Sequence, residues 1–459
     1  MTLIKSISGI RGTIGGEPGT NLTPPDIVKF VYGYSAWVCS VSGSRASKIV
    51  VGRDARLSGE MLSNIVCGTL VALGHEVVDI GLATTPTTEL AVAEEKAAGG
   101  IILTASHNPK EWNALKLLNA KGEFLSDAEG KKVLEFSDTA IANYPEVEAI
   151  GHVVRKDYTD YHIEHVLNLE HVDVEAIKKA KLRIVVDGIN SVGGVVVPEL
   201  LKVLGVADIV TLNCEPHGDF AHNPEPVPEN LIGISETVKA QNADMGIVVD
   251  PDVDRLAFIA DNGEMFGEEY TLVAIADYIL KYEKGNTVSN LSSSRALSDV
   301  AGRYGCTYSA AAVGEVNVVA EMKKTGAVIG GEGNGGVIYP KSHYGRDALV
   351  GIGLFLSHFV KEGKSMTELK KSYPRYFISK NKIKLTPELD VDSVLDRIKQ
   401  EYRHEKITDT DGVKIDFPEG WVHLRKSNTE PIIRIYSEAK DKAGAKALAQ
   451  IIIDSVKSL

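Results

Sequence analysis

The stretch KIVVGRDARLSGEMLSNIVCGTLVALG, residues 48–74, decides the fold class. It begins with a short β-branched apolar run, turns at Gly52 and Asp54, and continues as an amphipathic segment of helical length. The same pattern of apolar run, turn and helical segment recurs in LRIVVDGINSVGGVVVPELLKVLG, residues 182–205. Strand patterns that alternate with helix patterns are typical of βαβ units. The sequence therefore predicts an α/β protein with mainly parallel or mixed sheets covered by helices.

The length of 459 residues indicates three or four domains. A charged, aromatic-rich segment at 152–166, a turn that starts at Asp261, and Pro374 mark changes along the chain. After Pro374 the pattern becomes helix, three strands and a last helix, which predicts a smaller α+β domain. No glycine-serine linker separates these segments, so they are expected to pack against each other. The predicted boundaries are 1–155, 156–262, 263–373 and 374–459.

Composition and charge exclude several classes of partner. Hydrophobic residues make up 44% and charged residues 24%, as in ordinary globular proteins. The 62 acidic against 50 basic side chains leave a formal charge of -12, which argues against a nucleic-acid or anionic membrane surface. A small anionic ligand in a local pocket remains compatible with this balance.

The cysteines and the apolar runs bear on the compartment. The four cysteines form no C-x-x-C pair, which argues against a zinc site or a dense disulfide framework and favours a reduced compartment. No apolar run approaches the roughly 18 residues of a membrane span. We expect a cytoplasmic protein without a membrane segment.

Two loops suggest phosphoryl chemistry. In GGIILTASHNP, an apolar strand ends just before Ser106, and Pro109 prevents its continuation, so the serine is expected to be exposed at a turn. An ordinary turn or helix-cap serine is the alternative.

In MGIVVDPDVDR, a buried strand runs into Asp250, Asp252 and Asp254, whose close charges would raise each other's pKa without a cation. Such oxygen ligands suit Mg²⁺, whereas the alternative is a solvated acidic turn.

Two further loops suggest a phosphorylated sugar. AVIGGEGNGGVIYP carries Glu332 and Asn334 among glycines, and these side chains suit sugar hydroxyls or an amine. The nearby segment 341–347 adds cationic groups, which could be purely structural. In WVHLRKSNTEP, Arg425 precedes hydroxyl and amide side chains in one turn, as a phosphate site requires, although a plain hairpin turn is the alternative.

Together the four loops resemble those of the α-D-phosphohexomutase family, which includes phosphoglucomutases, phosphomannomutases and phosphoglucosamine mutases. The resemblance covers the whole chain, because SGIRG at 8–12 and GRD at 52–54 also match. The four principal motifs are TASHNP at 104–109, DPDVDR at 250–255, GEGNG at 331–335 and RKSNTEP at 425–431. The resemblance implies four domains around a central cleft: three related α/β domains and a smaller C-terminal α+β domain that binds phosphate.

The resemblance also implies roles for individual residues. Ser106 would be the phosphoserine, and Lys116 the proton shuttle. The implied catalytic set is Ser106, His107, Lys116, Arg11 and Arg255; the implied Mg²⁺ ligands are Ser106, Asp250, Asp252 and Asp254; the implied substrate contacts are Glu332, Asn334, Arg425, Ser427, Asn428 and Thr429.

The implied reaction interconverts hexose 6- and 1-phosphates through a sugar 1,6-bisphosphate. Asn334 replaces a serine that plain hexose mutases are expected to carry, so glucosamine phosphate is the predicted substrate, with glucose or mannose phosphate as the alternative. The partner is a small phosphosugar, and a monomer or homodimer is expected.

The chain departs from the family pattern at three places, one of which is Pro251 in the aspartate loop, where glycine is common and proline is compatible with a tight turn. Several relatives have histidine where this chain has Gly336, and a lysine or arginine where it has Val316, which leaves the sugar contacts there open. Two other functions would account for only part of this pattern. An aspartate-based phosphatase that uses Asp250 and Asp252 would leave Ser106 unexplained, and an inactive sugar-phosphate sensor would not need the serine and three aspartates.

Overall fold

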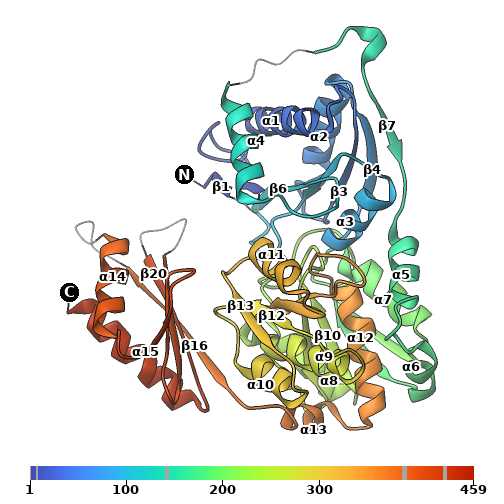
Figure 1. The fold of residues 1–459 in the computed structure, drawn as a ribbon. Helices are drawn as coiled ribbons and strands as arrows, with labels where there is room; N and C mark the ends of the chain where they lie inside the picture. The colour runs from blue at the N-terminus through green and yellow to red at the C-terminus, as the bar shows by residue number, and fades with distance from the viewer. Residues whose placement is uncertain (1, 7–8, 140–143, 385–389, 427–431, 459) are drawn as a thin grey trace. The chain divides into compact units, whose positions relative to one another are not determined.

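The structure is a computed structural model that describes residues 2–6, 9–139, 144–384, 390–426 and 432–458 (Figure 1). Its internal contacts divide the chain into two compact units. Unit one comprises Met1–Thr271 and Asn334–Thr367, and unit two comprises Leu272–Gly333 and Glu368–Leu459. The predicted domain boundaries remain a prediction.

The first sheet is mixed and has seven strands in the order β1-β2-β6-β5-β3-β4-β7. The strands β3, β4, β5 and β7 run parallel, whereas β1, β2 and β6 are antiparallel to their neighbours. The elements are β1 (Ile4–Ser6), β2 (Gly9–Thr13), α1 (Pro24–Ser42), β3 (Lys48–Arg53), α2 (Gly59–Ala72), β4 (Glu76–Leu82), α3 (Thr85–Glu94), β5 (Gly99–Leu103), β6 (Trp112–Leu118), α4 (Asp127–Thr139) and β7 (His152–Arg155).

Helices cover both faces of this sheet because successive side chains of a strand point to opposite sides. Ile49 and Val51 of β3 belong to the apolar core shared with α1 and α2, whereas Val50 packs in a second core with α3. All five residues of β5 are buried, as expected for a strand covered on both faces.

The second sheet has the order β11-β10-β8-β9, with β10, β8 and β9 parallel and β11 antiparallel. Every residue of β10 and β11 is buried. The elements here are α5 (Thr159–Leu167), α6 (Val174–Ala180), β8 (Arg183–Asp187), α7 (Gly193–Val203), β9 (Asp208–Leu212), α8 (Ile232–Ala240), β10 (Met245–Val249) and β11 (Leu256–Ala260). Unit one also contains β15 (Gly336–Ile338) and α12 (Ala348–Glu362).

Unit two contains the parallel strands β13, β12 and β14, with β12 in the middle. The elements are β12 (Thr287–Asn290), α10 (Ala296–Arg303), β13 (Tyr308–Ala311), α11 (Glu315–Thr325) and β14 (Ile329–Glu332). Two helices cross the division between the units, α9 (Glu268–Tyr282) and α13 (Met366–Lys371).

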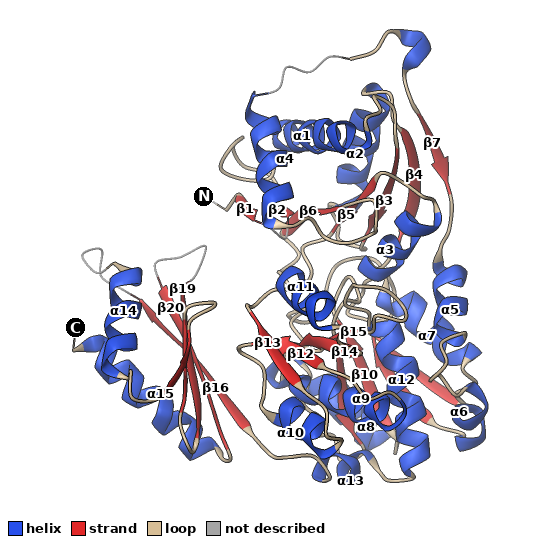
Figure 2. Ribbon diagram, viewed as in Figure 1, coloured by secondary structure: helices blue, strands red, loops and turns tan. Residues whose placement is uncertain are grey.

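The C-terminal segment forms an antiparallel sheet in the order β16-β20-β19-β18-β17 (Figure 2). Apolar residues from its strands and its two helices form one core, which includes Ile398, Val422 and Ile452. The elements are β16 (Phe377–Lys384), α14 (Val391–Glu401), β17 (Lys406–Thr408), β18 (Val413–Asp416), β19 (Gly420–Lys426), β20 (Ile432–Ala439) and α15 (Lys442–Lys457).

The predicted α/β class and the smaller α+β domain at the C-terminus are confirmed. Two local predictions were inexact. Glu332 and Arg425 were placed in loops, but Glu332 is the last residue of β14 and Arg425 lies inside β19. Among the described helices, none combines the length and the apolar character that crossing a membrane requires.

Candidate functional site

Ser106 lies just beyond β5, in a strained turn of unit one. Its φ of 49° is in the left-handed region, which non-glycine residues rarely adopt. Its hydroxyl donates a hydrogen bond of 2.7 Å to Oδ2 of Asp250. The serine was expected to be exposed, but only 8% of its surface is accessible because the turn faces the aspartate loop. The two predicted loops are therefore brought together.

Arg56 holds the Ser106 turn in place, a role that the sequence analysis missed. Its side chain is buried and donates hydrogen bonds to the carbonyl oxygens of Ser106, Asn108 and Pro109. Its Nε donates to Oδ2 of Asp54 at 3.0 Å. The matched segment GRD at 52–54 contains Asp54, but Arg56, the other member of the ion pair, lies outside that segment.

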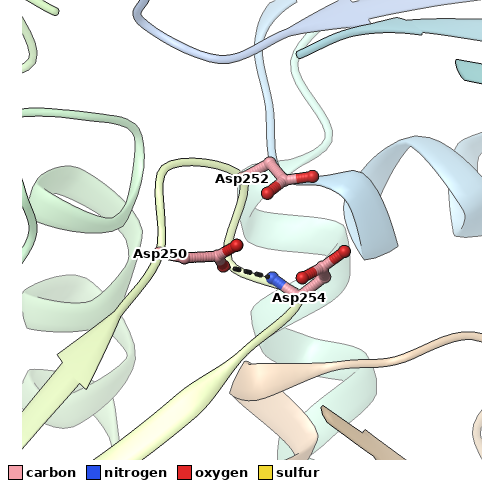
Figure 3. Close-up of side chains that lie close together, drawn as sticks. All are labelled: Asp250, Asp252 and Asp254. Atoms are coloured by element: carbon pink, nitrogen blue, oxygen red, sulfur yellow. Dashed lines mark hydrogen bonds between the residues drawn. The ribbon is translucent and has the colours of Figure 1, made fainter. Parts of the chain in front are cut away.

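Asp250, Asp252 and Asp254 follow the buried strand β10, and all three are fully buried. One oxygen from each lies within 4.8 Å of the others, and Figure 3 shows the carboxylates projecting from the same loop. The backbone N–H groups of Asp254 and Arg255 both donate to Oδ1 of Asp250 at 3.1 Å. Val253, a β-branched residue, has a φ of 61°, so this loop is strained as well.

Three cationic side chains compensate the aspartates. Lys116 Nζ donates to Oδ2 of Asp252 at 2.7 Å and to Oδ2 of Asp254 at 3.3 Å. Arg346 Nη2 donates to Oδ2 of Asp254 at 2.6 Å. Arg255 Nε lies 4.0 Å from carboxylate oxygens of Asp250 and Asp254. Arg346 belongs to the cationic segment 341–347, whose role the sequence left open.

The pKa values of Asp250 and Asp254 are shifted in opposite directions by burial and the surrounding charges. Burial and the neighbouring charges of Asp254 and Asp252 raise the pKa of Asp250 well above its usual range. Burial also acts to raise the pKa of Asp254, but the charges of Arg346, Lys116 and Arg255 outweigh it and hold that pKa below its usual range. Burial acts to lower the pKa of Lys116, yet the adjacent aspartates raise it overall. Mutual repulsion was expected to raise the carboxyl pKa values in the absence of a cation, and at Asp254 the cationic side chains reverse that direction.

The donor set fits a hard divalent cation. Oδ1 of Asp252 and Oδ1 of Asp254 are buried and have no hydrogen-bond partner within the described part of the chain. Buried carboxylate oxygens without partners are costly unless a cation binds them. Oxygen ligands of this kind suit Mg²⁺ better than a transition metal. The loop could thus hold a metal ion.

Arg11 and His107 lie near these residues. Arg11 in β2 pairs with Ala114 in β6, and Lys116 is two residues further along β6, so Arg11 and Lys116 lie on the same face of the sheet. His107 Nδ1 is 3.5 Å from Oγ of Ser106. Burial and the charge of Arg255 lower the pKa of His107 well below its usual value.

The predicted sugar and phosphate contacts are divided between the units. In unit two, Oε1 of Glu332 accepts hydrogen bonds from Asn290 Nδ2 at 2.9 Å and from the Gly314 N–H at 3.0 Å. In unit one, Oδ1 of Asn334 accepts one from the Gly336 N–H at 3.2 Å.

The predicted phosphate turn is described only at its start. In unit two, Arg425 Nε donates to Oδ2 of Asp411 at 2.8 Å, and the Val313 N–H donates to the same oxygen at 2.9 Å. Ser427, Asn428 and Thr429 lie outside the described residues.

Family models match the chain over nearly its full length. They are described as phosphoglucomutase/phosphomannomutase alpha/beta/alpha domains I, II and III and the C-terminal domain, at residues 3–143, 160–263, 267–376 and 381–455.

Individual relatives agree with these matches. A phosphoglucomutase/phosphomannomutase of Thermococcus kodakarensis is 37% identical, with 96% of each chain covered. A probable phosphoglucosamine mutase of Methanopyrus kandleri is 32% identical, with 98% of this chain and 97% of the relative covered. A solved structure of a phosphoglucomutase/phosphomannomutase family protein from Burkholderia thailandensis has the same fold, with a TM-score of 0.84 at 24% identity over 99% of this chain and 98% of that one. The chain therefore belongs to the phosphoglucomutase/phosphomannomutase family and is a phosphohexomutase, an intramolecular phosphotransferase.

Proposed function

We propose that this enzyme interconverts glucosamine 6-phosphate and glucosamine 1-phosphate through a phosphorylated Ser106. The observation that carries the proposal is the 2.7 Å hydrogen bond between the Ser106 hydroxyl and Asp250, at the edge of a buried aspartate triad with compensating cations. An aspartate-based phosphatase would give Ser106 no role. Glucose or mannose phosphate is the alternative substrate.

The chemical step transfers the phosphoryl group from Ser106 to a sugar hydroxyl. The Oγ–P bond breaks, the sugar oxygen forms a new bond to phosphorus, the hydroxyl proton moves to a base, and Oγ takes up a proton. Lys116 is the proposed proton carrier, with His107 beside the serine. Arg11 and Arg255 would border the phosphoryl oxygens, because phosphoryl transfer depends mainly on positioning and charge neutralisation.

Asp250, Asp252, Asp254 and the Ser106 phosphate are the proposed ligands of Mg²⁺. When bound, the ion would supply Lewis-acid stabilisation of the charge on the transferring group. The two unpartnered oxygens on Asp252 and Asp254 support this assignment.

The sugar must then present its other phosphate to Ser106. A sugar 1,6-bisphosphate is the proposed intermediate, and it would reorient while the C-terminal domain releases and rebinds the distal phosphate. Arg425, Ser427, Asn428 and Thr429 are the proposed contacts of that phosphate.

Arg425→Ala is expected to lower kcat/KM by about 30-fold, mainly through KM, because the contact of a guanidinium with phosphate contributes about 2 kcal/mol. Steady-state kinetics with the preferred sugar phosphate measure this change. Lys426→Ala is the matched control, since Lys426 is the next residue in β19 and its ion pair with Asp392 is exposed. Equal kinetics for both variants would place the distal phosphate elsewhere.

The choice of glucosamine rests on Glu332 and Asn334. An ammonium group at the 2-position offers only donors, and carboxylate and amide oxygens can accept them. Both groups act as acceptors in the structure: Oε1 of Glu332 accepts from Asn290 Nδ2 and the Gly314 N–H, and Oδ1 of Asn334 accepts from the Gly336 N–H. The name of the Methanopyrus kandleri relative is consistent with an amino-sugar substrate.

The sugar is tested by comparing kcat/KM for glucosamine 6-phosphate, glucose 1-phosphate and mannose 1-phosphate. We expect the amino sugar to lead and the others to retain measurable activity, because one lost hydrogen bond discriminates by only about 1–3 kcal/mol. If kcat/KM for either hexose phosphate exceeds that for glucosamine 6-phosphate by about tenfold or more, equivalent to about 1.4 kcal/mol, the enzyme is a general hexose mutase and the glucosamine assignment is wrong. We further propose that the enzyme is cytoplasmic and is a monomer or a homodimer.

A further inference from the structure

Arg346 reaches the aspartate loop from the segment between β15 and α12. Its side chain is mostly buried, and its Nη2 donates to Oδ2 of Asp254 at 2.6 Å. Lys116 donates to the same oxygen at 3.3 Å. The other oxygen, Oδ1 of Asp254, is the one without a hydrogen-bond partner among the described residues. The two cations thus bind one oxygen of the carboxylate, whereas the other oxygen lies 4.0 Å from Nε of Arg255 without a hydrogen bond to it.

Gly336 provides the space that the Arg346 side chain occupies. A Cβ at position 336 would lie 2.2 Å from Cδ and 3.0 Å from Cγ of Arg346. It would also lie 3.2 Å from Oδ1 of Asn334. A carbon cannot approach the arginine stem so closely, so any side chain at 336 would displace Arg346. The glycine at position 336, where several relatives have histidine, therefore leaves the room that Arg346 needs.

Residues on both sides of Arg346 anchor its loop. His343 Nδ1 lies 3.2 Å from Oε2 of Glu89 in α3, and its Nε2 lies 3.0 Å from Oδ2 of Asp347. Asp347 also contacts Nε2 of His162 at 2.9 Å and accepts hydrogen bonds from the first N–H groups of α12. Contacts that precede and follow Arg346 thus restrict where its guanidinium can lie.

We propose that Arg346, accommodated by Gly336, is a positioning residue that orients Asp254 toward the divalent cation. The inference rests on the proposed metal site. Groups that hydrogen-bond to metal ligands fix the ligand orientation, and their loss typically lowers metal affinity about 10- to 100-fold. A cation that acted only through its charge would have the opposite effect, because its removal would strengthen binding of Mg²⁺.

The test uses the full-length protein and four variants: Arg346→Met, Arg346→Lys, Gly336→Ala and the double variant Gly336→Ala/Arg346→Met. Calorimetric titration with MgCl₂ gives the metal affinity without turnover, after the phosphorylation of all samples has been equalised. Gly68→Ala is the control, since a Cβ there would meet nothing within 4 Å.

We expect Arg346→Met and Gly336→Ala each to weaken Mg²⁺ binding about tenfold or more, and the double variant to be no weaker than Arg346→Met. Arg346→Lys should recover part of the affinity. At saturating Mg²⁺, the single variants should retain a normal KM for the sugar phosphate with reduced kcat, a pattern that general loss of structure would not produce.

Two results would overturn the inference. Unchanged or tighter Mg²⁺ binding by Arg346→Met would show that its side chain does not position Asp254. Independent, multiplicative losses in the double variant would show that Gly336 acts on something other than Arg346. Absence of Mg²⁺ binding by the unsubstituted protein would instead overturn the proposed metal site, and the inference with it.

Discussion

Replacing Ser106 with alanine is expected to lower turnover by more than about a thousandfold, because no neighbouring group can replace a covalent phosphoryl carrier. The fold should be retained. The hydrogen bonds that hold the turn use the backbone of Ser106, whose N–H donates to Thr104 Oγ1 and whose carbonyl accepts from Arg56. Alanine carries the same backbone strain as serine at this positive φ. Steady-state turnover of the purified variant measures the effect.

Mass spectrometry provides the second measurement for this variant. The unsubstituted enzyme should carry a phosphoryl group on the peptide that contains Ser106, and the alanine variant should not. A matched control is Ser126→Ala, which removes a hydroxyl at the start of α4 that hydrogen-bonds Glu129. Near-normal turnover in Ser106→Ala would overturn the phosphoserine mechanism, whichever sugar the enzyme prefers.

Removal of divalent cations is expected to have an effect of similar size. Asp250, Asp252 and Asp254 are matched by the charges of Lys116, Arg255 and Arg346. A phosphoserine then adds about -1.5 to -2. Without a divalent cation this charge remains uncompensated in a buried site, and it opposes approach of an anionic sugar phosphate. Turnover should fall when a chelator is added and should return with MgCl₂.

A pair of variants separates a bound metal from a general effect of chelation. Asp252→Asn removes a carboxylate with an unpartnered buried oxygen, and we expect loss of calorimetric Mg²⁺ binding. Asp187→Asn changes another buried aspartate at a strand end, whose oxygens already accept from Asn213 and contact His222. Asp187→Asn should keep its Mg²⁺ affinity. An undiminished rate in chelator would mean that the three aspartates are not metal ligands.

Much of the candidate site could be predicted because its motifs are local. Ser106 and Asp250 each follow an apolar strand, and a strand that ends in polar residues is visible in a few consecutive letters. The order of strands and helices could also be predicted, since both have short periods of two and 3.6 residues. The family resemblance assigns the serine and the aspartates to one site, and the structure places the Ser106 hydroxyl 2.7 Å from Oδ2 of Asp250.

The residues that hold these groups could not be predicted in the same way. Arg56 holds the carbonyl of a residue 50 positions later, and Arg346 binds an aspartate 92 positions earlier. No local period relates such residues, and an isolated arginine in a loop looks like a solvated surface charge. The lowered pKa of Asp254 could not be predicted for the same reason, because two of its compensating cations, Lys116 and Arg346, come from distant segments.

The sequence by itself determined the α/β class, the polar strand ends and the chemical types of the reacting groups, because each depends on residues that are neighbours in the chain. Only the tertiary structure decided which cations neutralise the aspartates and why position 336 is a glycine. The space beside Gly336 is filled by Arg346, and Arg346 and Lys116 both donate to Oδ2 of Asp254, while Oδ1 has no hydrogen bond among the described residues. Such choices follow from close packing and charge balance among segments far apart in the sequence, which no local pattern specifies.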